Sequence, residues 1–207
     1  MARWTDTVTT HEELALLFGS VAPASLHKEV STIPACYRAL IEASPFFVLA
    51  TSGPGGLDAS PRGDAPGFVV VEDERTLLIP DRRGNNRIDS LRNIVSDPRV
   101  ALLFLVPGRG ETLRVNGRAQ IVTDASLRAR FAVEGKLPAC VLAVTVETMF
   151  FQCARAVLRS RLWDPAALDR AQGLPSAGQM LAALAEGGFD GEAYDKALPE
   201  RQRCSLY

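Results

Sequence analysis

Three arginines and two asparagines stand together in residues 82–87, inside the stretch "LLIPDRRGNNRIDSLRNI". The apolar residues before them predict a buried strand that ends at Pro80, and those after them predict a helix that starts near Asn85 or Asn86. The first amide groups of a helix lack partners within it and carry partial positive charge, which favours an anion. Arginines add charge-assisted, often bidentate, hydrogen bonds to phosphate. The candidate phosphate ligands are therefore Arg82, Arg83, Asn85, Asn86 and Arg87. A surface helix with solvated arginines would show the same residue types, so both interpretations stay open at this point.

A second polar stretch, "LDASPRGDAPGFVVV", places Arg62 and Asp64 among prolines and glycines between two apolar segments. Proline and glycine predict a stiff, irregular backbone here, where a smooth strand ladder would otherwise be expected. Such a backbone can lie against a flat ligand. The alternative is a bulge on an edge strand, with a surface pair of Arg62 and Asp64 worth about 0–1 kcal/mol and no function.

Two types of element must position these groups. The stretches "TTHEELALLFG" and "STIPACYRALIEAS" predict helices, the first with a capping box of Thr10 and Glu13. Six short runs rich in Val, Leu, Ile and Thr then predict strands: "FFVLATS", "FVVVED", "RTLLIP", "RVALLFLVP", "ETLRVNGRAQIVT" and "ACVLAVTVE". The predicted fold is mainly β with flanking helices, built on a six-stranded antiparallel sheet that closes as a barrel or packs as a sandwich.

Composition limits the kinds of partner. The 207 residues carry a formal net charge of -1, with 47% hydrophobic and 23% charged residues, as expected for a globular protein. This balance gives no overall field for binding nucleic acid or a membrane surface, so any anion must be recognised locally. The apolar runs are too short to cross a bilayer and the N-terminus lacks a signal sequence, which favours a cytoplasmic protein.

The residues most often used in catalysis are sparse. His11 and His27 are the two histidines, both near the N-terminus, and the four cysteines form no C-x-x-C pair. No metal site, disulfide framework or Ser/His/Asp triad is predicted. The catalytic residues cannot be named from the sequence.

The ordered set of motifs resembles the pyridoxamine 5'-phosphate oxidase-like FMN-binding split-barrel family. The motifs are "FFVLATSGPGGLDASPRGD", then "LLIPDRRGNNRIDSLRNIVSDPRVALLFLVPG", then "ETLRVNGRAQI". The resemblance runs from about residue 44 to residue 161. It implies a six-stranded split β-barrel at 44–163, with a helical extension at 1–43 and a helical tail at 164–207 that packs on the barrel or on a dimer partner.

The resemblance also implies a cofactor and an assembly. FMN would lie between the two subunits of a homodimer, its phosphate held by the turn after the "LLIPD" strand and its ring edge beside the "SPRGD" strand. Asn86 is neutral at a position where the family commonly has a cation, so nearby arginines would supply the charge. The implied cofactor-binding residues are Ser60, Arg62, Asp64, Arg82, Arg83, Asn85, Asn86, Arg87 and Thr112.

The activity implied is that of an FMN-dependent oxidoreductase acting on an unknown small molecule, with hydride supplied by a nicotinamide donor or by the substrate. The sequence lacks the C-terminal substrate signature of the vitamin-synthesising oxidase, so oxidation of pyridoxamine 5'-phosphate itself is not expected. The alternatives are a non-catalytic flavin-binding or flavin-storage protein, a haem-binding split barrel, and a deazaflavin in place of FMN.

Overall fold

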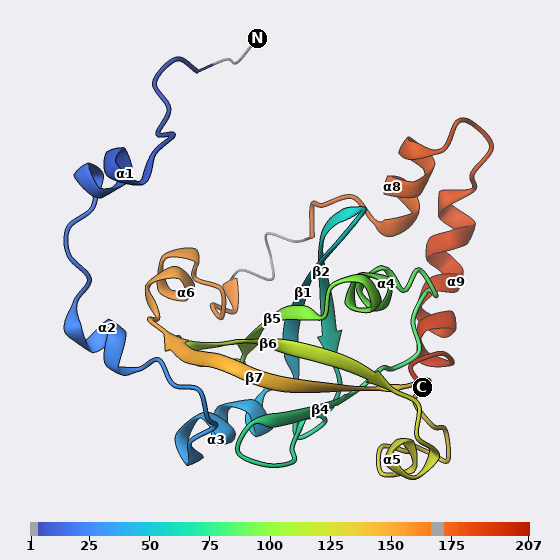
Figure 1. The fold of residues 1–207 in the computed structure, drawn as a ribbon. Coiled ribbons are helices and arrows are strands. Elements are labelled where there is room, and N and C mark those ends of the chain that lie inside the picture. Colours follow the sequence, from blue (N-terminus) through green and yellow to red (C-terminus); the bar gives the residue numbers. More distant parts are fainter. Residues whose placement is uncertain (1–3, 167–171) are drawn as a thin grey trace.

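The chain folds around one antiparallel sheet, as the computed structural model describes it for residues 4–166 and 172–207. The strands are β1 (Phe46–Gly53), β2 (Gly56–Gly63), β3 (Val70–Val71), β4 (Thr76–Pro80), β5 (Arg99–Leu105), β6 (Thr112–Val122) and β7 (Val141–Gln152). Their order across the sheet is β2-β1-β5-β6-β7-β4-β3. In Figure 1 the sheet bends strongly, so that β1 and β2 run across the direction of β6 and β7.

Helices flank the sheet and continue the chain at both ends. They are α1 (His11–Leu17), α2 (Pro23–His27), α3 (Ala35–Ala43), α4 (Asp89–Ser96), α5 (Ala125–Ala129), α6 (Arg155–Ser160), α8 (Ala177–Leu184) and α9 (Gly191–Arg203). The predicted class, mainly β with flanking helices, is confirmed. Of the predicted tail, residues 167–171 lie outside the described part of the chain.

The sheet has seven strands, and the prediction of six was wrong. The additional strand is β2, which pairs with β1 in an unbroken register from Phe46 opposite Gly63 to Gly53 opposite Gly56. The irregular backbone expected for "LDASPRG" is therefore a regular ladder. Pro61 fits it because β2 lies at the edge of the sheet, where a residue without an amide hydrogen can face away from the neighbouring strand.

The core lies inside the bend of the sheet. Apolar residues at alternate positions of the strands point inward, as period-two side-chain alternation requires. The ring of Phe47 contacts that of Phe68 at 5.8 Å and that of Phe104 at 5.0 Å between centroids, and Ile41 of α3 is fully buried against them. At Gly117 the pairing of β6 with β7 shifts by a residue, and an added Cβ would lie 2.1 Å from the carbonyl oxygen of Thr145. The backbones of β6 and β7 therefore approach closely at this position.

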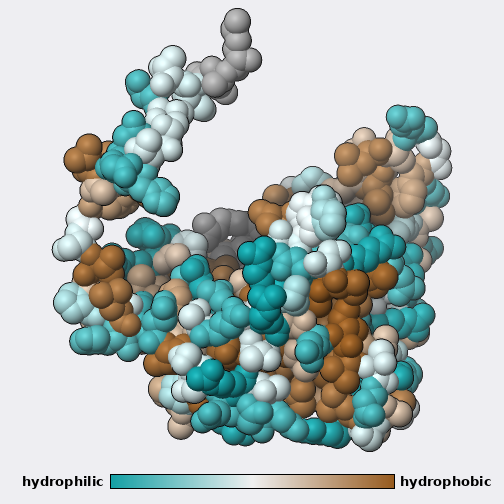
Figure 2. Space-filling view, in the orientation of Figure 1, coloured by the Kyte–Doolittle hydropathy of each residue, from teal (hydrophilic) through white to brown (hydrophobic). Residues whose placement is uncertain are grey.

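The N-terminal arm, residues 4–27, projects away from the sheet (Figure 1). The predicted capping box of Thr10 and Glu13 forms, yet α1 buries no residue. Figure 2 shows hydrophobic side chains gathered on this arm and over α8. The exposed residues there are Leu14, Leu16, Leu17, Phe18, Met180, Leu181 and Leu184. Among the described residues no helix is long and apolar enough to span a membrane.

Candidate functional site

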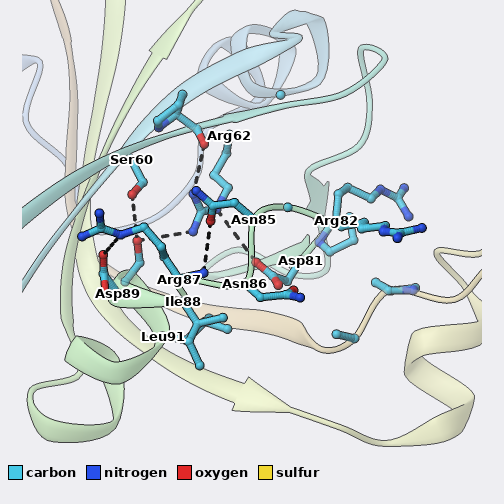
Figure 3. A pocket seen from close by; sticks show the side chains of 18 of the residues that line it. Ser60, Arg62, Asp81, Arg82, Asn85, Asn86, Arg87, Ile88, Asp89 and Leu91 are labelled. Carbon is cyan, nitrogen blue, oxygen red and sulfur yellow. Dashed lines mark hydrogen bonds and ion pairs between the residues drawn. The ribbon is translucent and has the colours of Figure 1, made fainter. Parts of the chain in front are cut away.

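A cavity of about 740 Å³ opens between β2, the segment from β4 to α4, and the loop before β7 (Figure 3). Its volume lies within the range of about 300–1,000 Å³ found for small-molecule and cofactor sites. The main lining residues are Asp58, Ser60, Arg62, Phe68, Asp81, Arg82, Arg83, Asn85, Asn86, Arg87, Asp89, Ser90, Lys136, Leu137, Pro138 and Tyr207. Cationic, amide and carboxylate groups therefore face one another across a single space.

The segment between β4 and α4 has an unusual backbone. Asn86 and Ile88 both adopt left-handed conformations, with φ of 60° and 52°. Asparagine tolerates this region, but for a β-branched residue such as isoleucine it is an outlier. The side-chain oxygen of Asn85 accepts a hydrogen bond from the Arg87 amide at 3.1 Å, which closes a local turn. The helix consequently begins at Asp89, and the prediction of a start near Asn85 or Asn86 was wrong, because left-handed residues interrupt a right-handed helix.

The N-terminus of α4 is open toward the cavity. Its N-cap residue, Ile88, has no polar side chain and makes no capping hydrogen bond to the first turn. Unpaired first-turn amides and the helix dipole attract an anion. The guanidinium of Arg87 lies beside this turn, where its Nε donates to Asp89 at 2.9 Å. The helix end and the arginine place hydrogen-bond donors for an anion at one corner of the cavity, where the Asp89 carboxylate already pairs with Arg87.

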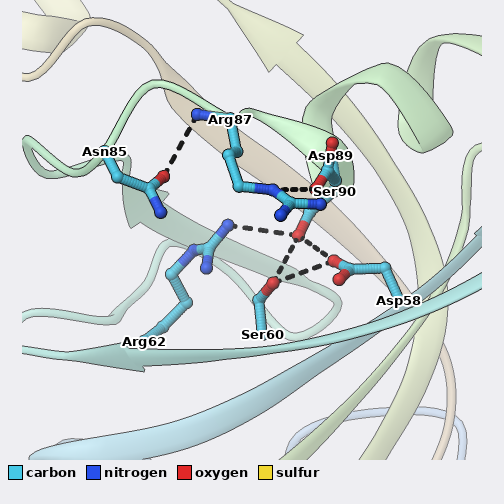
Figure 4. Close-up of polar contacts among 7 residues, drawn as sticks. All are labelled: Asp58, Ser60, Arg62, Asn85, Arg87, Asp89 and Ser90. Carbon is cyan, nitrogen blue, oxygen red and sulfur yellow. Dashed lines mark hydrogen bonds and ion pairs between the residues drawn. The ribbon is translucent and has the colours of Figure 1, made fainter. Parts of the chain in front are cut away.

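A buried serine ties α4 to β2 (Figure 4). The hydroxyl of Ser90 donates to Asp58 at 2.6 Å and accepts from Arg62 Nη2 at 3.3 Å. Ser60 donates to the same carboxylate oxygen at 2.8 Å. The hydrogen bond from Ser90 is the largest cause that holds the pKa of Asp58 below its ordinary value. On the other side of α4, Asn93 donates to Thr51 of β1 at 3.1 Å, so the helix is fixed against two strands.

One carboxylate of the cavity is poorly solvated. Burial raises the pKa of Asp81, and the guanidinium of Arg62, 4.0 Å away, opposes this only in part. The neighbouring thiol of Cys140 behaves in the same way, since burial and then the Asp81 charge raise its pKa to about 11. Burial therefore disfavours the charged form of both groups, of which Asp81 lines the cavity.

The opposite end of the cavity holds a second polar cluster. The Nε of Arg82 donates to Asp64 Oδ2 at 2.6 Å, and the hydroxyl of Tyr207 donates to Asp64 Oδ1 at 2.7 Å. Burial pushes the pKa of Asp64 upward, but the hydrogen bonds from Tyr207, a backbone amide and Arg82 outweigh it and hold the pKa below its ordinary value. The bond to Asp64 raises the pKa of the Tyr207 phenol, which stays protonated as the donor.

Most of the residues expected at the cofactor site lie together, but two do not line the cavity. The expected residues that line it are Ser60, Arg62, Arg82, Arg83, Asn85, Asn86 and Arg87. Asp64 stands behind this wall, bonded to Arg82 and Tyr207. Thr112 lies elsewhere, at the start of β6, where its hydroxyl is 3.4 Å from Gln152 of β7.

Sequence reasoning missed several residues that line the cavity. Asp58 could have been found, because it lies two residues before Ser60 and shares its face of β2. Ser90 stands in the first turn of α4. Hydroxyl residues are common at this position of helices, so the sequence did not indicate that Ser90 lines the cavity. Nothing near Tyr207 indicates a contact with residues 143 positions earlier in the chain.

The histidines and possible metal ligands lie outside this cavity. His11 and His27 are in α1 and α2, and neither lines it. Within residues 4–166 and 172–207 no group of three or more His, Cys, Asp or Glu side chains could hold a metal ion.

Comparison with known proteins points to one family. A family model described as pyridoxamine 5'-phosphate oxidase matches residues 33–153, which is more than half of the chain. The match includes β1 to β7 and the whole segment from β4 to α4. A search of curated proteins finds no match.

Several solved structures are similar to part of this chain. HupZ from Group A Streptococcus is 20% identical, with 58% of this chain and 94% of that chain covered and a TM-score of 0.48. A putative pyridoxamine 5'-phosphate oxidase from Lactobacillus delbrueckii is 20% identical, with 58% and 95% covered and a TM-score of 0.46. An FMN-binding protein from Syntrophomonas wolfei is 12% identical, with 55% and 82% covered and a TM-score of 0.43.

Proposed function

The chain belongs to the pyridoxamine 5'-phosphate oxidase family, and from this premise we propose that it binds FMN in the cavity between β2 and α4 and acts as an FMN-dependent oxidoreductase on a small molecule. One observation carries the proposal. The open N-terminus of α4, with Arg87 beside it and Arg62 behind it, forms an anion-binding corner in a cavity of cofactor size. Among family members, this corner is where a flavin phosphate is expected.

The groups present suit a phosphate. The first-turn amides of α4 would donate to its oxygens, and Arg87 and Arg62 would supply positive charge. Asn85 and Asn86 shape the turn that aims these donors. Arg83 also lines the cavity and adds positive charge there. Arg82 already donates to Asp64 and to the carbonyl of Phe131, so it would contribute charge more than new hydrogen bonds.

The cavity continues from this corner along β2. Ser60 and Arg62 would lie beside the ring system, and the apolar ring of Phe68 lines the same space. When bound, FMN supplies a centre that accepts or donates a hydride. The chain itself would bind and orient the flavin, and the partly buried Asp81 lines the same cavity. The hydride would come from a nicotinamide donor or from the substrate.

The accessible surface supports a homodimer. The chain exposes 14044 Å², whereas a compact monomer of 22.3 kDa exposes about 9,400 Å². The excess of roughly 4,600 Å² on one chain is more than the about 1,000–2,500 Å² that each subunit of an obligate homodimer commonly buries, so a subunit interface could cover part of it. Much of the exposed apolar area lies on the N-terminal arm. We propose that a second copy of the chain covers part of this area and completes the FMN site.

The test begins with the visible spectrum of the purified protein, before and after incubation with FMN and removal of the excess by gel filtration. Retained flavin bands with an affinity in the micromolar range or tighter would support the cofactor assignment. A protein that never retains flavin would refute it. Oxidation of NADH or NADPH by the flavin-loaded protein would separate an enzyme from a flavin-storage protein, which has the same site but no turnover. A parallel titration with a deazaflavin identifies which of the two ring systems the site prefers.

A further inference from the structure

The residues that follow α9 return to the cavity of their own chain. In Figure 1 α9 runs from the α8 end of the molecule toward the side of the sheet where the chain ends. Tyr207 lines the cavity there, together with Lys136 and Leu137 of the loop before β7. A segment far from the FMN site in the sequence therefore contributes one of its walls.

The pair of helices that carries Tyr207 is held as a unit. α8 and α9 approach so closely that a Cβ added at Gly178 would lie 2.0 Å from the carbonyl oxygen of Gly191. Asp195 of α9 accepts hydrogen bonds from the amide of Gly178, at 2.7 Å, and from the hydroxyl of Ser176. These contacts keep the two helices together, so the position of Tyr207 depends on how the end of α9 is fixed.

Asp64 is the residue that fixes it. The Asp64 side chain is only 5% exposed. Its Oδ1 accepts from Tyr207 at 2.7 Å and from the Ala65 amide at 2.8 Å, while its Oδ2 accepts from Arg82 at 2.6 Å. The guanidinium of Arg82 also lies 5.5 Å from the centre of the Tyr207 ring, within cation–π distance. Both carboxylate oxygens are occupied within the chain, which leaves Asp64 little capacity to bind a ligand directly.

The cluster lies at the end of the cavity away from the proposed phosphate. Ser60, beside α4, and Asp64 are four residues apart on extended backbone, which separates them by about 13 Å at roughly 3.3 Å per residue. In Figure 3 Arg82 lies on the far side of the cavity from Asp89. A molecule with its phosphate at α4 would therefore extend toward Tyr207. The phenol oxygen gives its only hydrogen to Asp64 and keeps lone pairs free to accept one.

We propose that Tyr207 is a binding residue of the FMN site, an inference that rests on the proposed function. Its ring forms the wall of the cavity opposite α4 and shields the bound molecule from solvent. Its phenol oxygen accepts one hydrogen bond from the flavin or the substrate. Asp64 and Arg82 are positioning residues that act through Tyr207.

The first experiment measures how easily iodide quenches the fluorescence of flavin bound to the protein. Tyr207→Ala and Asp64→Asn should each raise the quenching constant severalfold. The first variant removes the Tyr207 ring from the cavity wall, and the second weakens the hydrogen bond that holds this ring in place. Tyr194→Ala is the matched control, since it makes the same truncation in α9, the helix before Tyr207, and lies outside the cavity. Quenching at the wild-type level in Tyr207→Ala would overturn the proposal.

A second experiment needs no flavin, so it distinguishes failure of this inference from failure of the proposed function. Hydrogen exchange of the amides in residues 200–207 is compared between the wild-type protein and Asp64→Asn. Faster exchange in the variant is expected, because the end of α9 loses its anchor. If exchange responds but no flavin is ever retained, the contact stands and the FMN assignment fails. Unchanged exchange would show that Asp64 does not hold Tyr207.

Discussion

Replacing Arg62 with alanine should weaken FMN binding far more than replacing Arg87, although both arginines face the proposed phosphate site. The two differ in their surroundings. The side chain of Arg62 is 23% exposed and lies between Ser90 and Asp81, whereas that of Arg87 is 77% exposed and paired with Asp89 on the surface. Water and salt screen the second arginine much more than the first.

The expected magnitudes follow from this difference in exposure. A charge-assisted hydrogen bond in a half-buried site contributes about 1.5–3 kcal/mol. At about 1.4 kcal/mol per factor of ten, Arg62→Ala should raise the Kd for FMN about tenfold to 150-fold. An exposed ion pair is worth about 0–1 kcal/mol, so Arg87→Ala should raise the Kd by at most about fivefold. The Arg87 effect should also shrink with added salt.

The assay is titration of each variant with FMN, followed by quenching of flavin fluorescence at low and at high salt. Arg99→Ala serves as the control, because Arg99 is 71% exposed, pairs with an aspartate as Arg87 does, and lies on β5 outside the cavity. Thermal unfolding of each variant checks that the fold is intact. The reasoning is refuted if Arg87→Ala costs more affinity than Arg62→Ala, or if neither variant differs from the control. In the second case the phosphate would lie elsewhere.

Three further predictions concern other parts of the molecule. In the folded protein at pH 8, iodoacetamide should modify Cys153 early, because a backbone hydrogen bond lowers its pKa. It should spare Cys140, because burial raises the pKa of that thiol to about 11. Mass spectrometry follows the modification, and equal rates at the two cysteines would contradict this prediction. Gly117→Ala should lower the free energy of unfolding by about 1–3 kcal/mol through overpacking, and Gly55→Ala, where an added Cβ meets nothing within 4 Å, should leave it nearly unchanged in urea titrations. Deletion of residues 1–22 should weaken the proposed homodimer, because it removes exposed apolar side chains of the N-terminal arm. Analytical ultracentrifugation measures the dimer affinity, and equal affinity with and without these residues would exclude the arm from the interface.

Local patterns predicted many of the elements correctly. The predicted capping box of Thr10 and Glu13 forms in α1. Such motifs depend on residues three or four apart, so the sequence carries all the information that they need. Short runs of β-branched and aromatic residues likewise predicted where most strands lie.

Two local predictions failed because a neighbouring element decided the outcome. Strand β2 contains Pro61 and two terminal glycines, and only its place at the sheet edge beside β1 makes a regular ladder possible. The predicted start of α4 was too early. Asn86 and Ile88 adopt a left-handed backbone that interrupts the helix, and neither residue type requires that conformation.

The sequence by itself determined the mainly β class, the family, and the arginine and asparagine cluster between β4 and α4, since each depends on residue types within short stretches of chain. The tertiary structure alone decided which groups face one another. It placed Asp58 and Ser90 together across 32 residues, moved Asp64 from the cavity wall to a position behind it, and brought Tyr207 to the cavity. The physical reason is that contacts between distant segments follow from the bend of the sheet and the path of α9, and no local periodicity records them.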